Sequence, residues 1–319
     1  MADPESRLSL KRRVAAVGTF DGLHKGHRRV ISKVKEEAAS RGLEPLVVMF
    51  DRHPLETLAP ERAPGLLQSP SERTNILYNE GLGIMVLEFT PTLAAMTAED
   101  WLRKMHDDQG VDVLIVGYDN TFGSDGTRMN LSDYRNLGAK IGVEVLEAPY
   151  EPHTSSSAIR RLVADGDVVG AANLLGYKFA ITGEVVAGKH IGSSIGTPTA
   201  NVRPSYRAQM PKNGVYVVDV LTPDGRKHRG VANIGYQPTV ASDAPLRLEV
   251  HIPDFRGDLY GEKLRVEFLG RLRDEMKFDS LESLKERISL DILAALNFTG
   301  KTESDGQTSA SGTNKNKTL

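Results

Sequence analysis

Short apolar runs alternate with helix-patterned segments through the first half of the chain. The runs predict five buried strands, at residues 14–19, 46–50, 84–88, 111–116 and 143–146. Between the first two runs the apolar residues recur at helical spacing, at Val30, Ile31, Val34 and Ala38. Strands that alternate with helices are typical of a parallel sheet covered on both faces. The first half is therefore predicted to be an α/β unit with a doubly wound parallel sheet.

Residues that begin and end helices stand between these runs. Ser69 opens a Ser-Pro-Ser-Glu capping box, and Gly81 is expected to end the helix that follows it. Thr97 is expected to cap another helix. Gly42 and Gly142 are expected to be the C-caps of two more.

After about Gly176 the pattern changes to short valine-rich runs separated by turns. These runs lie at residues 214–221, 229–234, 246–252 and 263–269, which is typical of a small antiparallel barrel or sandwich. One amphipathic helix follows, capped by Asp279 or Ser280. Its expected apolar face consists of Leu281, Leu284, Ile288, Ile292 and Leu296. From residue 301 the chain has almost nothing to bury, and we expect a disordered tail.

Composition excludes several classes of protein. The chain has 319 residues, enough for roughly two domains. It has no cysteine, which excludes a disulfide scaffold, thiolate metal sites, iron–sulfur clusters and a cysteine nucleophile. Its 40 basic and 42 acidic side chains leave a net charge of −2, which disfavours nucleic acid and anionic membranes as partners. The apolar run at 14–17 is too short for a signal peptide or a membrane span, so a cytoplasmic location is expected. We expect the protein to be a monomer or a weak homo-oligomer.

Two histidines stand in the turn after the first predicted strand. His24 and His27 are three residues apart where a helix begins, so both could reach one anion at that helix terminus. Gly26 between them lets the backbone come close to a ligand. Imidazoles beside a phosphate can stabilise charge that develops during group transfer. The alternative is a solvated turn with incidental histidines.

A second candidate phosphate site lies late in the first half. Ser155 and Ser156 open a helix, and Arg160 follows one turn later, so hydroxyls and a guanidinium could clamp a phosphate. The alternative is an ordinary serine N-cap with a surface arginine. His53 and Asp119 follow the second and fourth strands, where a ligand crevice is expected, although each could be an ordinary turn residue.

The second half contains a glycine-rich stretch followed by Pro-Thr-Ala-Asn. Glycines at 188, 192 and 196 would let backbone N–H groups face phosphates. In the extended segment that follows, Thr199 and Asn201 point to the same side and offer hard oxygen ligands suited to Mg²⁺. A glycine-rich hairpin is the alternative. On the strand at 246–252, Glu249 lies on the polar face and could accept a proton, or could belong to a solvated strand face.

These motifs resemble those of a known family. The stretch Gly-Thr-Phe-Asp-Gly-Leu-His-Lys-Gly-His at 18–27 resembles the signature of adenylyl-transferring nucleotidyltransferases, and 154–160 resembles their second motif. The segments 188–201, 230–239, 248–261 and 272–278 resemble a riboflavin kinase domain. Together the halves resemble the bacterial bifunctional riboflavin kinase/FAD synthetase over about residues 12 to 298.

The resemblance implies a fold and two ATP-dependent reactions. A Rossmann-like, doubly wound FMN adenylyltransferase domain at 1–176 would precede a six-stranded antiparallel β-barrel kinase domain with a C-terminal helix at 177–298, and a tail at 299–319. The barrel would convert riboflavin and ATP into FMN and ADP, with Mg²⁺ as cofactor. The first domain would convert FMN and ATP into FAD and diphosphate.

The resemblance also assigns roles to individual residues. The catalytic residues would be His24, His27, Arg160 and, as the base of the kinase, Glu249. ATP would be bound by Gly18, Phe20, Gly26, Ser155, Ser156, Gly188, Gly192 and Gly196. The flavin would be bound by His53, Asp119, Asn120, Arg273, Glu275 and Phe278, and Mg²⁺ by Thr199 and Asn201.

The chain departs from the family pattern at four positions. They are Asn120, Ala158, Ser193 and Thr197, where the family usually has an aromatic residue, Arg, Arg and Phe. These departures bear on affinities and rates more than on the type of reaction. Two other functions stay open: a riboflavin kinase with a weak adenylyltransferase half, and a flavin or nucleotide sensor. An RNA-binding barrel is disfavoured by the net charge and by an aromatic content of 6%.

Overall fold

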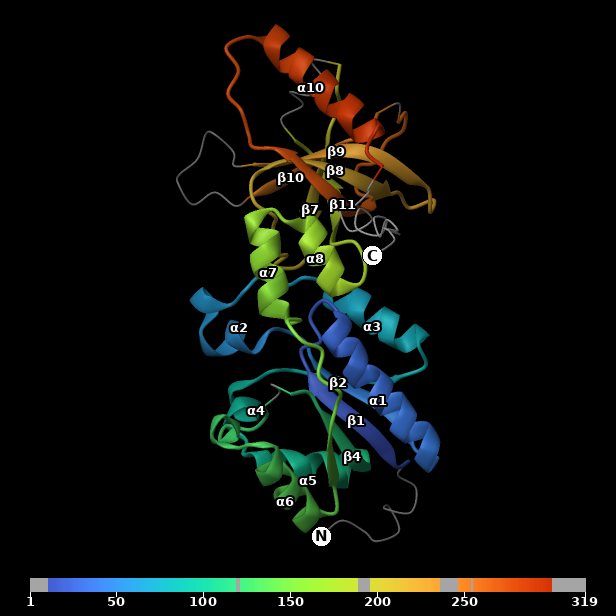
Figure 1. Cartoon of the computed structure of the whole chain (residues 1–319), viewed down its shortest axis with the longest axis vertical. Coiled ribbons are helices and arrows are strands. Elements are labelled where there is room, and N and C mark those ends of the chain that lie inside the picture. Colours follow the sequence, from blue (N-terminus) through green and yellow to red (C-terminus); the bar gives the residue numbers. More distant parts are fainter. Residues whose placement is uncertain (1–10, 119–120, 189–195, 236–245, 254, 300–319) are drawn as a thin grey trace, which may run out of the picture.

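The chain folds into a parallel sheet, a closed barrel and a last helix, in that order (Figure 1). The computed structural model describes residues 11–118, 121–188, 196–235, 246–253 and 255–299. Residues 300–319 of the tail expected at 299–319 lie outside these ranges. The predicted fold class is confirmed in both halves.

The sheet has five parallel strands in the order β3-β2-β1-β4-β5. They are β1 (Arg13–Gly18), β2 (Glu44–Phe50), β3 (Gly83–Leu87), β4 (Val111–Val116) and β5 (Glu144–Glu147). All five agree with the predicted runs to within two residues. The order reverses between β1 and β4, and ligands of such sheets bind outside the carboxyl ends of the strands at that point.

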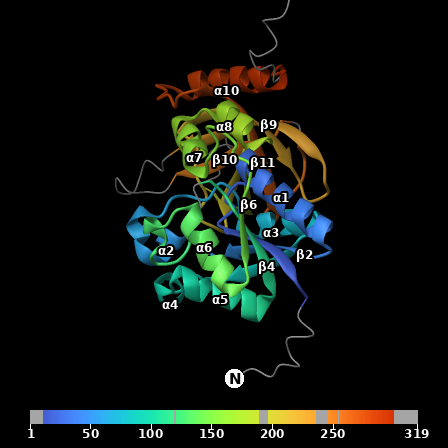
Figure 2. The same cartoon turned by 60° about the horizontal axis from the view of Figure 1, so that its bottom comes forward.

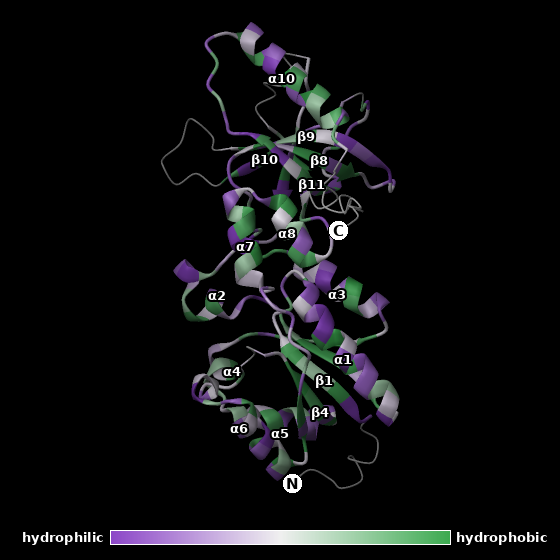
Figure 3. Cartoon of the chain, viewed as in Figure 1, coloured by the Kyte–Doolittle hydropathy of each residue, from purple (hydrophilic) through white to green (hydrophobic). Residues whose placement is uncertain are grey.

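Helices cover both faces of this sheet. The longer ones are α1 (Lys25–Arg41), α3 (Pro70–Asn79), α5 (Ala98–Gln109) and α6 (Leu131–Ile141), and the short ones are α2 (Pro54–Leu58), α4 (Pro91–Ala95), η2 (Pro60–Arg62) and η3 (Gly126–Arg128). Val14 and Ala16 pack with α1 and α3, whereas Ala15 and Val17 pack with α5 and α6. This alternation makes β1 apolar on both faces, and Figure 3 shows it as a mostly hydrophobic strand beside helix α1 of mixed character.

The predicted caps form. Ser69 Oγ accepts a hydrogen bond from the backbone N–H of Glu72 at 3.2 Å, and the Glu72 side chain returns to the Ser69 N–H, closing the capping box. Gly42 and Gly142 end α1 and α6 in the left-handed conformation, with φ of 66° and 96°.

The second half is a closed antiparallel barrel in the order β10-β7-β6-β11-β8-β9. Its strands are β6 (Ala180–Val186), β7 (Ala200–Pro204), β8 (Gly214–Leu221), β9 (Lys227–Gly235), β10 (Arg247–His251) and β11 (Lys263–Arg273). The valine-rich pattern did not mark β6 and β7. Gly183 interrupts the apolar pattern of β6 but not the strand, and a Cβ there would lie 2.6 Å from the Arg203 carbonyl of β7.

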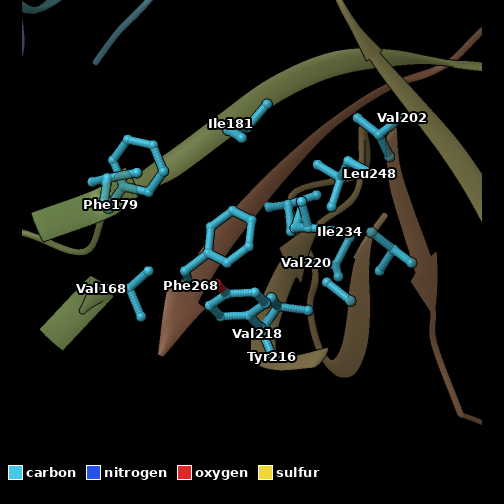
Figure 4. Close-up of a cluster of buried hydrophobic side chains, with 14 of the residues drawn as sticks. Val168, Phe179, Ile181, Val202, Tyr216, Val218, Val220, Ile234, Leu248 and Phe268 are labelled. Atoms are coloured by element: carbon cyan, nitrogen blue, oxygen red, sulfur yellow. The ribbon is translucent and has the colours of Figure 1, made fainter. Parts of the chain in front are cut away.

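The barrel core also includes two helices that precede the barrel in the chain. Figure 4 shows Phe268 among apolar side chains of the barrel strands, with Val168 beside them. Val168 belongs to α8 (Val168–Leu175), and Val163 of α7 (Ser156–Asp165) packs into the same core. Both helices therefore lie between the sheet and the barrel (Figure 1).

Helix α10 (Leu281–Leu296) lies at the end of the molecule away from the sheet in both views (Figure 2). Ser280 is its N-cap. The expected apolar face is wrong at both ends, since Leu281 and Leu296 are each 54% exposed, whereas Ala295 is buried. At about 100° per residue, Ala295 lies only about 20° around the helix from Leu284, but Leu296 lies about 120° away.

Within the described ranges, no helix is both long and apolar enough to cross a membrane.

The barrel core predicts a large effect of truncating Phe268. Its ring is 1% exposed and its centroid lies 5.4 Å from that of Tyr216. Phe268→Ala should lower the free energy of unfolding by about 3–5 kcal/mol, measured by urea denaturation. Leu293→Ala is the matched control on α10, because Leu293 is 56% exposed, and it should cost less than about 0.5 kcal/mol. Equal effects of the two variants would contradict the assignment of this core.

Candidate functional site

The turn that follows β1, called the signature turn (18–27), brings its two histidines together. His24 is the N-cap of α1, and its Nδ1 accepts a hydrogen bond from the His27 backbone N–H at 3.3 Å. The two rings stack with centroids 3.7 Å apart. Gly26 leaves room for this pair, since a Cβ there would lie 3.2 Å from the His24 ring.

A hydrogen bond fixes the tautomer of a neutral His24, and burial fixes the charge of His27. Because Nδ1 of His24 accepts a backbone hydrogen bond, a neutral His24 carries its proton on Nε2. Burial lowers the pKa of His27 well below its ordinary value, and the charges of His24, Arg73 and Arg160 lower that pKa further. His27 is therefore neutral at pH 7. The neutral His27 ring can donate a hydrogen bond to an anion without burying a positive charge.

The two phosphate motifs of the first half meet in space. Ser156 Oγ donates to the backbone carbonyl of Asp21 at 3.0 Å, which joins α7 to the signature turn. Ser155 caps α7 by accepting from the Ala158 N–H at 3.2 Å. A Cβ at Gly26 would lie 3.5 Å from the Thr154 carbonyl. The N-termini of α1 and α7 thus meet at one place.

Arg160 is held by the protein itself. Its Nη2 lies 2.6 Å from Asp21 Oδ2, and its Nε donates to the Gly65 carbonyl at 2.9 Å. The Asp21 side chain is fully buried and also accepts from the Leu67 N–H at 3.0 Å. The guanidinium that the resemblance assigns to a phosphate is thus oriented by a buried carboxylate.

Two further residues of the turn support it from beneath. Phe20 is 2% exposed, and its ring centroid lies 5.2 Å from that of His27. Its φ of 47° is left-handed, which is uncommon for a residue with a side chain. A Cβ at Gly18 would touch the same ring at 3.4 Å. The side chain of Phe20 faces the core, so a ligand would meet its backbone.

His53 lies in the same electrostatic surroundings. It caps α2, with Nδ1 accepting from the Leu55 N–H at 3.1 Å. Burial lowers the pKa of His53, and Arg160 lowers it further. Asp119 and Asn120 lie outside the described residues, so their predicted contacts with a flavin stay predictions.

Three residues near this site were missed by sequence reasoning. Arg73 of α3 is 1% exposed and donates to the Thr19 carbonyl, but its sequence position looks like an ordinary helix surface. Tyr118 and Tyr150 follow β4 and β5, are 71% and 60% exposed, and have centroids 4.8 Å apart. Aromatic residues directly after two neighbouring strands were the available signal for this second pair.

A row of polar residues crosses three strands of the barrel. Glu249 on β10 pairs in register with Asn201 on β7 and with Asn233 on β9. Its neighbours Leu248 and Val250 are 1% exposed and face the core, so Glu249 faces outward. Burial raises the pKa of Glu249; nearby Glu275 raises this pKa further, against an opposing effect of Arg247. The raised pKa makes this carboxylate a stronger base than an exposed one.

Glu249 borders a cavity beneath α10, called the α10 cavity, of about 330 Å³. Its apolar lining consists of Val215, Val231, Met276, Phe278, Leu284, Ile288 and Ile292. Arg273 and Glu275 line it as well, so the predicted flavin residues of the barrel gather around the predicted base. The Arg273 guanidinium is itself bound to Asp291 of α10, with Nη2 2.6 Å from Oδ2.

A second cavity, called the Phe255 cavity, has about 220 Å³ and is lined by Phe255, Leu259 and Tyr260 among others. Thr199 lines both cavities, so it stands where they adjoin. Gly188 lies against Asn201, since a Cβ at Gly188 would be 2.1 Å from Asn201 Nδ2. Gly196 has a φ of 82°, whereas Gly192 and Ser193 lie outside the described residues.

The residues between the cavities offer oxygen ligands to a metal. The Thr199 hydroxyl and the Asn201 amide are hard donors of the type that Mg²⁺ prefers. The buried Thr197 Oγ1 has no hydrogen-bond partner in the described structure, which leaves a further oxygen available. No group of three His, Cys, Asp or Glu residues suited to a metal occurs in the part of the chain described here. The donor set fits a cation shared with phosphates rather than a cation held by the protein alone.

Known proteins match both halves. A family model described as FAD synthetase matches residues 6–159, and one described as riboflavin kinase matches residues 175–299. A bifunctional riboflavin kinase/FMN adenylyltransferase of Pseudomonas fluorescens is 39% identical, over 88% of this chain and 91% of its own. The protein of that name from Escherichia coli K12 is 36% identical over 91% and 94%.

A solved structure matches the whole fold. It is the crystal structure of a protein described as a macrolide-efflux protein, from Streptococcus pneumoniae. It has a TM-score of 0.81 and 33% identity, and covers 94% of this chain and 96% of its own. The efflux role in that description concerns that protein alone, since both family models and the curated relatives name flavin-forming activities.

The lowered pKa of His27 predicts a pH effect on stability. Below about pH 6.5, His27 becomes protonated in the unfolded chain but stays neutral in the folded chain. The free energy of unfolding therefore falls as pH falls. His27→Gln should remove this contribution to the pH dependence of the free energy of unfolding, which is at most about 1.4 kcal/mol per pH unit. Urea denaturation at pH 7.5 and pH 5.5 should show a smaller loss in the variant. An equal loss in both proteins would contradict the prediction.

Proposed function

The chain belongs to the family of bifunctional riboflavin kinase/FMN adenylyltransferases, and we propose that each reaction uses the site described in its own half. The barrel phosphorylates riboflavin with ATP to give FMN and ADP. The first half joins FMN to the adenylyl group of ATP to give FAD and diphosphate. The observation that carries the assignment is that each half has a polar site of its own: the stacked His24–His27 pair at two helix N-termini, and Glu249 beside two adjoining cavities.

In the kinase reaction, we assign the flavin to the α10 cavity. Its apolar lining suits a flat ring system, and Glu249 lies at its edge. ATP would occupy the Phe255 cavity, with its γ-phosphate near Thr199. The terminal ribityl hydroxyl attacks the γ-phosphorus, Glu249 accepts the hydroxyl proton, and ADP leaves.

The proposed kinase reaction includes a magnesium ion bound together with ATP. Thr199 and Asn201 would hold the ion together with ATP phosphates, and the bound ion would neutralise phosphate charge. The glycines at 188, 192 and 196 would let backbone N–H groups approach the same phosphates.

In the adenylyl transfer, a phosphate oxygen of FMN attacks the α-phosphorus of ATP and diphosphate leaves. No protein nucleophile is needed, so positioning and charge stabilisation supply the catalysis. The His24 and His27 rings donate hydrogen bonds to the phosphates at the positive end of α1. Arg160 supplies charge from its place against Asp21, and Ser155 and Ser156 hold the start of α7 beside it.

The remaining proposals concern the flavin-binding residues, the domain boundary, the location and the partners. Arg273, Glu275 and Phe278 line the proposed riboflavin site, whereas His53, with Asp119 and Asn120, belongs to the proposed FMN site of the first half. We keep the proposed boundary after residue 176, since α8 ends at Leu175, although α7 and α8 pack into the barrel core. Reactions that consume ATP favour the cytoplasm. Small-molecule substrates require no nucleic acid partner, and each proposed site is built within one chain, as in a monomer or weak homo-oligomer.

A product assay tests the two reactions. The protein is incubated with riboflavin, ATP and Mg²⁺, and riboflavin, FMN and FAD are separated by chromatography. Glu249→Gln should lower FMN formation at least about a hundredfold, because the general base is lost. His27→Ala should spare FMN formation and slow FAD formation. FMN without FAD from the unaltered protein would favour the kinase with a weak adenylyltransferase half, and no conversion would favour a sensor.

The kinase reaction should depend on pH through Glu249. Its kcat/KM for riboflavin should rise with pH, with a midpoint above the value of about 4.3 for an exposed glutamate, because burial raises the pKa of Glu249. Glu275→Gln should move the midpoint to lower pH, since the like charge of Glu275 contributes to the raised pKa. Midpoints that coincide in the two proteins would rule out this coupling.

A further inference from the structure

One carboxylate connects the adenylyltransferase half to the kinase barrel. Glu72 is the third residue of α3, and its Oε1 accepts from Thr182 Oγ1 on β6 at 2.6 Å and from Arg265 Nη1 on β11 at 2.7 Å. Its Oε2 accepts from Ser69 Oγ at 2.9 Å within the capping box. The barrel therefore binds the residue that holds the start of α3 in shape.

The start of α3, in turn, holds the signature turn. The Leu67 and Gln68 N–H groups bind the Asp21 carboxylate at 3.0 and 3.3 Å. Arg73, next to Glu72, donates to the Thr19 carbonyl. Asp21 orients Arg160 at 2.6 Å. A single segment, 67–73, thus stands between the barrel and three parts of the adenylyltransferase site.

A second contact is direct. The Tyr177 hydroxyl, which lies just before β6, donates to the Gly22 carbonyl in the signature turn. Burial raises the pKa of Tyr177, so the hydroxyl keeps its proton at physiological pH. Gly22 stands two residues before His24 and next to Asp21, so this hydrogen bond acts on the turn with no residue in between.

A third contact between the two halves is made by backbone hydrogen bonds. The Leu66 N–H donates to the Arg207 carbonyl at 2.7 Å, and the Gln209 N–H donates to the Leu66 carbonyl at 2.8 Å. The chains approach so closely that a Cβ at Gly65 would lie 2.6 Å from Gln209 Cα. The Gly65 carbonyl also accepts from Arg160. The part of the chain just before β8 therefore sets the position of a carbonyl that binds Arg160.

We propose that Thr182, Tyr177 and Arg265, on the barrel side, are positioning residues for adenylyl transfer. They touch neither substrate; they hold the segment 65–73 and the signature turn in the arrangement that orients Arg160 and His24. The proposal rests on the adenylyltransferase function assigned above. It makes the rate of FAD formation depend on contacts with the domain that makes FMN.

The effect on rate exceeds the effect on stability. The Arg265 and Glu72 side chains are 28% and 22% exposed, so water screens the pair in part. Without Arg265, the Glu72 carboxylate still accepts from Thr182 and Ser69. Phosphoryl chemistry is far more sensitive, because a displacement of about 1 Å at a positioned group can cost about a hundredfold in rate. A loss of the contact should therefore appear in catalysis first.

The test uses the full chain and measures both reactions in the same preparations. Arg265→Met and Tyr177→Phe should each lower kcat for FAD formation from FMN and ATP about tenfold, which corresponds to about 1.4 kcal/mol in the barrier. KM for FMN and ATP should change less than about twofold, and kcat for FMN formation should stay within about twofold. Arg265→Lys should restore at least half of the lost rate, because the ammonium group can still pair with Glu72.

Lys227→Met is the matched control. Lys227 binds Glu267 at 3.0 Å on the same barrel, and Arg265 also approaches Glu267, at 3.5 Å, but Lys227 makes no ion pair with the first half in the described structure. This variant should leave both reactions unchanged. A merely structural role of Arg265 and Tyr177 would lower both reactions together, since one chain carries both.

Three outcomes would overturn the proposal: unchanged FAD formation in Arg265→Met and Tyr177→Phe, a parallel fall of both activities, or an equal effect of Lys227→Met. The unaltered protein separates this proposal from the function on which it rests. If that protein forms FAD, only the positioning role is at stake. If it forms FMN but no FAD, the adenylyltransferase function itself fails and the positioning role fails with it.

Discussion

The buried ion pair between Asp21 and Arg160 is the constraint on which the first site depends. A fully buried carboxylate is costly unless charge and hydrogen bonds compensate it, and leaving one partner alone costs about 3–5 kcal/mol. Here the compensation comes from three places in the chain: the guanidinium on α7, the N–H groups of Leu67 and Gln68, and the turn itself. The pair therefore forms only when the turn after β1, the start of α3 and the start of α7 are all in place. This is why two motifs 139 residues apart make one site.

The two proposed sites would bind a polyanionic nucleotide in different ways. In the first half, two helix N-termini and the stacked His24–His27 pair lie at the point where the strand order reverses. In the barrel, a row of oxygen-bearing side chains crosses the outer face of three strands between two cavities. Neither solution needs a strongly basic protein, which agrees with a net charge of −2. Electrostatic recognition is confined to short distances, where burial makes each dipole and charge effective.

Some residues of these sites could be predicted from the sequence, and others could not. The His24–His27 pair and the polar face of Glu249 follow from strict local geometry, the spacing at a helix start and the alternation along a strand, and both are present. Arg73 was not predictable, because its burial comes from the packing of α3 under the turn rather than from any pattern around it. Strand β6 escaped the pattern because Gly183 is required by the closeness of β7. The apolar face of α10 was predicted wrongly at Leu281 and Leu296, which are both exposed, whereas Ala295 is buried.

The sequence by itself determined the five strands of the sheet, most strands of the barrel, the family and the candidate residues, because capping, periodicity and motif spacing are properties of short stretches of chain. Only the tertiary structure decided what each polar group does within the protein. Arg160 and Arg273 look alike as free cations in a sequence, yet each is bound by a buried carboxylate, Asp21 or Asp291. Glu72 looks like a capping residue alone, yet it also binds the barrel. Whether a charge is satisfied inside the protein or left for a ligand depends on distant partners, and folding brings those partners together.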